Sequence, residues 1–139
     1  MHPSSFHFSI VVGCIVVIAG LAACAPEGTA KSGAAIFRQN CVVCHGPTGA
    51  GDGVQASQVS VPPANLRRMA AANDGVFPTE FAMAAIFGYR GKDYAALMPE
   101  FGPLFDGPTV IWRSPKGQEF VTPLSLLALA RYLETIQDP

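Results

Sequence analysis

The feature that most constrains this chain is the run Cys41-Val42-Val43-Cys44-His45. Its C-x-x-C-H spacing is typical of covalent haem attachment. The spacing matches the two vinyl groups of a porphyrin, so that each thiol can add across one of them and form a thioether bond. The histidine directly after the second cysteine is then presented beneath the ring, where its imidazole can bind the iron. The run therefore predicts a chain organised around one covalently bound haem c.

Two other kinds of site share part of this pattern. A structural zinc site needs four Cys or His ligands, and the chain after residue 24 has no second Cys/His pair. A thioredoxin-like redox motif belongs to a βαβ context, which the sequence does not predict. Haem attachment is the favoured interpretation, with Cys41, Cys44 and His45 as binding residues.

Residues 1–23 are interpreted as a targeting signal. They contain no Asp, Glu, Lys or Arg, and the chain from Phe8 to Ala25 is almost continuously apolar. An apolar stretch that ends in small residues is typical of a secretory signal. Because c-type haem is also attached outside the cytoplasm, both features predict a protein of the bacterial periplasm.

Three fates of this segment stay open. The residues L-A-A-C that end at Cys24 resemble a lipobox, which predicts a lipidated Cys24 as the first mature residue and a membrane anchor. The residues A-C-A around the same cysteine also fit ordinary cleavage to a soluble periplasmic protein. The apolar run further reaches the lower limit of length for an uncleaved membrane span. The favoured lipobox reading gives a signal peptide over 1–23, a tether over 24–29 and one domain over 30–139.

The charges and cysteines of the remaining chain limit its partners. Nine basic and ten acidic side chains all lie beyond residue 23, so the domain is close to neutral. It has no basic stripe with interleaved aromatic residues, which disfavours nucleic-acid binding. One cysteine lies in the leader, Cys24 is the lipid site and two bind haem, so none is left for a disulfide.

Helical and strand patterns predict the elements around the haem motif. We expect helices over 29–40, 65–72, 78–87 and 122–137, and a small hairpin over 109–121. Thr29 and Asn65 are expected N-caps, and Thr122-Pro123 is expected to begin the last helix. Gly33 and Phe37 share one face of the first helix. We expect the last helix to cross that face with its Leu/Tyr side.

Two loops follow the haem motif. Residues 46–53 are rich in glycine but lack the Lys-Ser/Thr of a phosphate-binding loop, so a loop around a haem edge is the better interpretation. Val61-Pro62-Pro63 is stiffened by the fixed φ angles of proline. A carbonyl of Pro62 or Pro63 could accept a hydrogen bond from the free ring nitrogen of His45, which would orient the imidazole.

The second axial ligand of the iron is expected to be a methionine. His45 is the only histidine beyond the leader, which excludes two histidine ligands. Met69 and Met83 lie in predicted helices among alanines, where methionine usually packs. Met98 follows a loop over 89–97 and is fixed by Pro99, so Met98 is the predicted ligand. An open site or another ligand remains the alternative.

Taken in order, these features resemble the class I c-type cytochromes, here a small bacterial monohaem cytochrome c with a lipoprotein-type signal. The resemblance covers residues 30–137 and rests on the Gly33/Phe37 helix, Cys41–His45, Pro62-Pro63, Met98-Pro99 and the final helix with Tyr132. It implies an all-α fold of three to five helices around one covalent haem, with the hairpin inserted before the C-terminal helix. It also implies His45 and Met98 as metal ligands and support of His45 by one of the two prolines.

The function implied is electron transfer between respiratory redox proteins or complexes, without a small-molecule substrate and without catalysis. Two departures from the family bear on the partner. The insertion over 103–121 is longer than in the smallest members, and the lysine-rich ring of mitochondrial-type carriers is missing. Two alternatives stay open: a permanently bound subunit of a larger dehydrogenase or oxidase, and an open-site haem enzyme or gas sensor. The second would require a distal acid–base residue, usually histidine, which this chain lacks.

Overall fold

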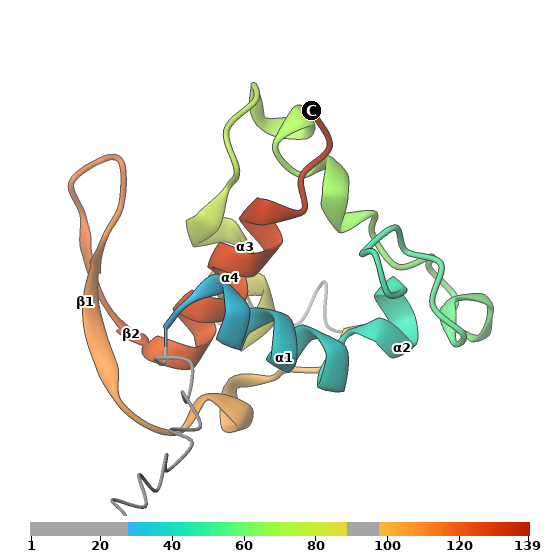
Figure 1. Ribbon diagram of the computed structural model, residues 1–139, viewed down its shortest axis with the longest axis horizontal. Coiled ribbons are helices and arrows are strands. Elements are labelled where there is room, and N and C mark those ends of the chain that lie inside the picture. The colour runs from blue at the N-terminus through green and yellow to red at the C-terminus, as the bar shows by residue number, and fades with distance from the viewer. Residues whose placement is uncertain (1–27, 89–97) are drawn as a thin grey trace, which may run out of the picture.

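The computed structural model describes residues 28–88 and 98–139. The expected leader and the expected loop over 89–97 lie outside these ranges. The described helices and strands are α1 (Ala30–Asn40), α2 (Val42–His45), α3 (Thr79–Phe87), β1 (Thr109–Arg113), β2 (Glu119–Pro123) and α4 (Leu124–Thr135). Helices α1 and α4 occupy the centre of Figure 1, with the hairpin on its left and α2 with the following loop on its right. None of the helices in the described part of the chain is long and apolar enough to span a bilayer.

Helix α1 begins where the sequence predicts. The Thr29 hydroxyl accepts from the Ser32 N–H at 3.3 Å, and the Ser32 hydroxyl accepts from the Thr29 N–H at 3.1 Å. This reciprocal pair satisfies two N–H groups that have no partner within the helix. The N-cap prediction is therefore confirmed, and α1 is fixed at the end that leads out of the tether.

Helices α1 and α4 cross at Gly33. A Cβ at Gly33 would lie 2.0 Å from the carbonyl oxygen of Ala128, so only glycine permits this approach. One turn later the Phe37 side chain is fully buried, and its ring centroid lies 5.2 Å from that of Tyr132. The predicted crossing is confirmed. It forms the centre of the core, whose fully buried large side chains are Phe37, Leu126 and Leu129.

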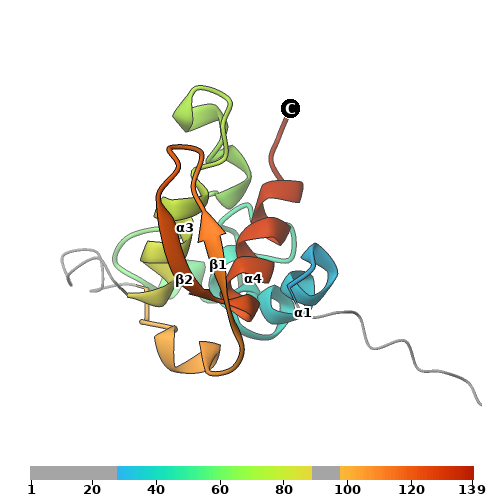
Figure 2. The same cartoon turned by 90° about the vertical axis from the view of Figure 1, so that its left-hand side faces the viewer.

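The predicted hairpin is also present. β1 and β2 pair antiparallel, and Trp112 lies opposite Phe120 with ring centroids 5.8 Å apart. This pair is half-buried, which agrees with a packing role for the tryptophan. Figure 2 shows the hairpin in front of α3 and α4. The opposite face carries Ile111 against Val121, both about 70% exposed.

The start of the last helix differs from the prediction. Thr122 and Pro123 belong to β2, and α4 begins only at Leu124. The Thr122 hydroxyl donates to the Phe120 carbonyl at 3.3 Å instead of capping the helix. The pairing of β2 with β1 includes Thr122 and Pro123. Because they are paired, both residues keep an extended backbone and the helix begins after them.

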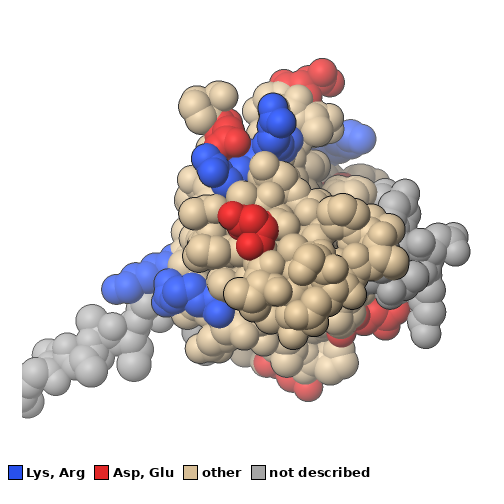
Figure 3. Space-filling view, turned by 90° about the vertical axis from the view of Figure 1, so that its right-hand side faces the viewer, with Lys and Arg blue, Asp and Glu red and all other residues tan. Residues whose placement is uncertain are grey.

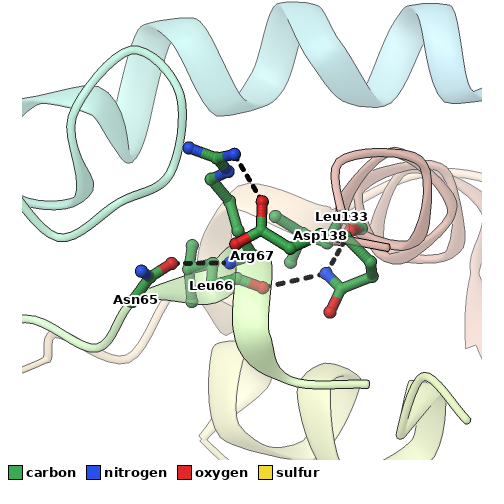
Figure 4. Close-up of polar contacts among 6 residues, drawn as sticks. Asn65, Leu66, Arg67, Leu133 and Asp138 are labelled. Atoms are coloured by element: carbon green, nitrogen blue, oxygen red, sulfur yellow. Dashed lines mark hydrogen bonds and ion pairs between the residues drawn. The ribbon is translucent and has the colours of Figure 1, made fainter. Parts of the chain in front are cut away.

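The segment expected as a helix over 65–72 forms two 3₁₀ turns, 66–68 and 71–73. Asn65 caps the first turn as expected, since its side-chain oxygen accepts from the Arg67 N–H at 3.0 Å. The side-chain amide of Gln137 separates the two turns: it donates to the Leu66 carbonyl and accepts from the Ala70 N–H, both at 2.8 Å. An α-helix would join that carbonyl and that N–H directly. Figure 4 shows the hydrogen bond to the Leu66 carbonyl and the neighbouring Arg67–Asp138 ion pair.

Candidate haem site

The C-x-x-C-H motif continues from the end of α1. The Cys41 N–H donates to the Phe37 carbonyl at 2.9 Å, and the His45 N–H donates to the Cys41 carbonyl at 2.8 Å. This single turn, α2, holds the motif against the core through Cys41 and Val42. Cys41 and Cys44 are both half-buried free thiols. Two thiols and an imidazole are thereby presented from one turn of backbone.

The glycine-rich loop folds back over this turn. Backbone N–H groups of Gly51, Gly53 and Gln55 donate to the carbonyls of His45, Cys44 and Val43, respectively, at 2.8–3.0 Å. A Cβ at Gly53 would lie 2.5 Å from the Val43 carbonyl oxygen. Glycine at this position allows the backbone of the loop to lie against the backbone of the motif.

His45 is held by a carbonyl oxygen. Its Nδ1 lies 3.0 Å from the oxygen of Ala64. A carbonyl can only accept, so Nδ1 carries the proton and Nε2 keeps its lone pair for a metal. The prediction that the carbonyl of Pro62 or Pro63 fills this role is wrong by one residue. The Pro63 oxygen faces Gly51 instead, where a Cβ would lie 2.5 Å from it.

Burial changes the acid–base properties of the motif. It lowers the pKa of His45, although the hydrogen bond to Ala64 opposes this effect. The neutral imidazole is the form that binds a metal. Burial, with a smaller contribution from Cys44, raises the pKa of the Cys41 thiol to about 11. Before haem is attached, Cys41 is therefore a protonated thiol at neutral pH.

The three candidate methionines differ in burial. Met83 is buried within α3, whereas Met69 and Met98 are half-buried and pack against the same core cluster. The chain after Met98 is fixed to the end of α3, because the Phe101 N–H donates to the Ile86 carbonyl at 3.0 Å. Met98 remains the predicted ligand. Within the described ranges, no group of three or more His, Cys, Asp or Glu side chains could hold a metal ion.

Sequence reasoning missed Ala64 and Gly51 as members of this site. Every residue has a carbonyl group, so the sequence offers no signal that selects the one at Ala64. Gly51 lies in the glycine-rich loop that the sequence does identify. Its contact with the Pro63 carbonyl depends on how two loops meet in space.

Comparison with known families supports the haem interpretation. Residues 28–110, more than half of the chain, match the sequence model of the family described as cytochrome c oxidase, cbb3-type, subunit III. No curated protein and no solved structure gives a significant match.

Domains of this family bind haem c covalently, typically one each, and the residues of this site fit that group. Cys41 and Cys44 are free thiols on one turn and are not paired with each other. The Nδ1 hydrogen bond of His45 leaves Nε2 available to iron. A covalent haem c at this turn is the cofactor of the protein.

Proposed function

This chain belongs to the family of the cbb3-type cytochrome c oxidase subunit III, and from that premise we propose that it is a membrane-anchored monohaem electron carrier of the periplasm. A cytochrome c domain of this kind serves haem-based electron transfer. The proposal adds that the domain moves single electrons between respiratory redox partners and binds no small-molecule substrate.

The observation that carries this proposal is the bond between His45 and Ala64. It fixes the imidazole in the tautomer whose Nε2 can bind iron, and a hydrogen-bonded histidine is a more basic ligand. Bound haem supplies a one-electron iron couple. Cys41 and Cys44 would hold the ring, and His45 and Met98 would supply the two protein ligands of the iron. With both ligands supplied by side chains, the iron would keep no open coordination site for a substrate.

The proposed anchor is a lipidated Cys24. Gly28 follows Cys24 by only four positions, which span at most about 14 Å of extended chain. The domain would then lie close to the membrane surface. Cleavage to a soluble periplasmic form and an uncleaved N-terminal span are the alternative fates of the same segment.

A second candidate is a permanently bound subunit of a larger oxidase or dehydrogenase, and the description of the matched family favours it. Purification from the native membrane in mild detergent distinguishes the two. A shuttle is expected to separate as a single chain, whereas a subunit co-purifies with its complex in stoichiometric amount. In both cases a redox titration is expected to show one reversible one-electron couple. Carbon monoxide binding by the untreated protein would instead favour an open-site haem enzyme or gas sensor.

A further inference from the structure

The C-terminal end of the chain is bound to a stretch of backbone that follows the haem motif. The Gln137 side-chain amide donates to the Leu66 carbonyl and accepts from the Ala70 N–H, both at 2.8 Å. Beside it, the Asp138 N–H donates to the Arg67 carbonyl at 2.8 Å, and the side chains of these two residues form an ion pair. The last residues of the chain thereby fix this stretch of backbone.

The fixed stretch is continuous with the carbonyl that holds His45. Ala64, whose carbonyl oxygen lies 3.0 Å from His45 Nδ1, is two residues before Leu66. The Leu66 N–H in turn donates to the Gly49 carbonyl at 2.8 Å, which joins the stretch to the glycine-rich loop. Leu66 is therefore held from two directions, through its N–H by that loop and through its carbonyl by Gln137.

Gln137 also keeps this stretch out of the α-helical conformation. The Leu66 carbonyl and the Ala70 N–H are the pair that an α-helix would join, and the sequence over 65–72 favours a helix. If that helical turn closed, the Leu66 carbonyl would move toward Ala70 and the peptide groups just before it would turn. The hydrogen bond on His45 is sensitive to such a movement, because a hydrogen bond weakens steeply when the N–H and the carbonyl move out of line.

Charged side chains are few around the haem motif. Between Arg38 and Arg67 the only Asp, Glu, Lys or Arg is Asp52. Figure 3 faces the side of the molecule that carries α2 and shows mostly uncharged side chains there. Neighbouring charges therefore contribute little to the properties of the iron ligand His45, and the hydrogen bond on its imidazole matters correspondingly more.

We propose that Gln137 is a positioning residue for His45. By holding the Leu66 carbonyl away from Ala70, it keeps the preceding peptide groups turned so that the Ala64 carbonyl accepts from the imidazole. A more basic imidazole stabilises ferric iron, so this contact lowers the reduction potential. The inference deepens the proposed electron-transfer function and rests on it, because the potential matters only to a protein that exchanges electrons.

The variant Gln137→Leu tests this inference, because leucine fills similar space but can neither donate nor accept a hydrogen bond. The imidazole of His45 then becomes less basic, so we expect the reduction potential of the holoprotein to rise. We also expect its Nδ1 proton to exchange with solvent about fivefold faster or more, the factor that corresponds to one typical hydrogen bond. Redox titration measures the first change, and NMR of the ferrous holoprotein in deuterated water measures the second.

Thr135→Val is the matched control at the same end of α4. The Thr135 hydroxyl donates to the Tyr132 carbonyl at 2.6 Å, just as the Gln137 amide donates to the Leu133 carbonyl at 2.7 Å. Both variants lose such a contact at the end of the helix and neither changes the charge, but only Gln137→Leu releases the stretch over 66–70. Thr135→Val is therefore expected to keep the wild-type potential and the wild-type exchange rate.

Gln137→Asn is a second variant, which decides the matter if the leucine variant does not mature. It keeps an amide but shortens the side chain by one CH₂, so that it cannot reach both the Leu66 carbonyl and the Ala70 N–H. We expect both measurements to change in the same direction as in Gln137→Leu.

Three results would overturn the inference alone: a wild-type potential in the Gln137 variants, a wild-type exchange rate in them, or the same changes in Thr135→Val. Each of these leaves the one-electron couple intact and the proposed function standing. A holoprotein with no reversible one-electron couple would overturn the proposed function, and this inference with it.

Discussion

The carbonyl oxygen of Ala128 occupies the space in which Gly33 would carry a side chain, 2.0 Å from an ideal Cβ. The two helix backbones therefore touch directly at the centre of the domain. One turn along α1, Phe37 and Tyr132 continue the contact through their rings. The next turn carries Cys41 and then the haem motif. The position of the site depends on this crossing.

Gly33→Ala is therefore expected to destabilise the protein. Alanine gains about 1 kcal/mol of helix propensity, but the added methyl group meets backbone atoms that can move only if α1 and α4 separate. Overpacking costs about 1–3 kcal/mol and occasionally more. We expect a cost at the upper end of that range, because the added methyl group meets backbone atoms. We expect a net loss of about 2 kcal/mol or more, measured by chemical denaturation of the holoprotein.

Lys31→Ala on the exposed side of the same helix is the control, with an expected change within about 0.5 kcal/mol. Wild-type stability in Gly33→Ala would contradict the close crossing.

Gly51→Ala tests the support of His45. Its Cβ would lie 2.5 Å from the Pro63 oxygen, and displacement of residues 63–64 would weaken the hydrogen bond from His45 to Ala64. A less basic imidazole stabilises ferric iron less, so the reduction potential is expected to rise. A left-handed φ also costs alanine about 1–2 kcal/mol.

Gly75→Ala separates the effect on the reduction potential from the backbone cost when both variants are compared with the wild type by redox titration. Gly75 has a φ of +80°, close to the +87° of Gly51, but its Cβ would meet no atom within 4 Å. It is expected to lose similar backbone stability while the potential stays unchanged. If Gly51→Ala and Gly75→Ala had the same reduction potential, the Pro63–Ala64 segment would not be what positions His45.

Much of this fold follows from local sequence. Thr29 caps a helix, the Gly33/Phe37 spacing predicts the face that α4 crosses, and a β-branched run before a Pro/Gly turn predicts the hairpin. The residues that form each of these signals lie close together in the sequence, so a single sequence is enough to recognise them. The haem motif is the strongest of them, because its chemistry fixes both residue type and spacing.

The errors all come from contacts between distant residues. The helix expected over 65–72 is interrupted by Gln137, which lies 71 residues beyond Leu66. Thr122 resembles an N-cap, yet pairing with β1 keeps it in a strand. The carbonyl that holds His45 belongs to Ala64 because the proline before it faces Gly51. Local propensity does not report tertiary partners of this kind.

Covalent attachment predicts how the cysteines behave on mutation. Wild-type holoprotein is expected to keep its haem through extraction with acidified organic solvent, because thioether bonds survive denaturation. Cys41→Ser or Cys44→Ser alone removes one bond, and the double variant removes both. We expect haem to be retained in the single variants that mature and extracted fully from the double variant. Free extraction of wild-type haem, after expression in a cell that makes c-type cytochromes, would contradict attachment at this motif.

The proposed anchor predicts the mature N-terminus. Diacylglycerol on Cys24 contributes two acyl chains, each with about 0.8 kcal/mol per buried CH₂, which is enough for stable attachment. Mass spectrometry of the native protein is expected to show a lipidated Cys24. The Cys24→Ser variant is expected to carry no lipid and to be absent from the membrane fraction. A mature chain that begins at Pro26 would indicate ordinary cleavage, and an intact Met1 would indicate a span.

The second axial ligand decides between a carrier and a catalyst. Met98→Ala leaves both cysteines in place, so haem stays attached while the sixth position opens to water or an added ligand. A thioether ligand raises the reduction potential. We therefore expect the potential to fall by a sizeable part of the roughly 0.8 V range that axial ligands span. Met69→Leu and Met83→Leu are the controls, because such near-isosteric changes usually cost under about 1.5 kcal/mol.

The most direct test of the account is a redox titration combined with carbon monoxide binding, carried out on the wild type and these three methionine variants. We predict that the wild type and both leucine variants share one reduction potential and bind no carbon monoxide. Met98→Ala is predicted to have a lower potential and to bind the gas. Ready binding by the wild type, or an unchanged potential in Met98→Ala, would contradict ligation by Met98 and favour an open iron site.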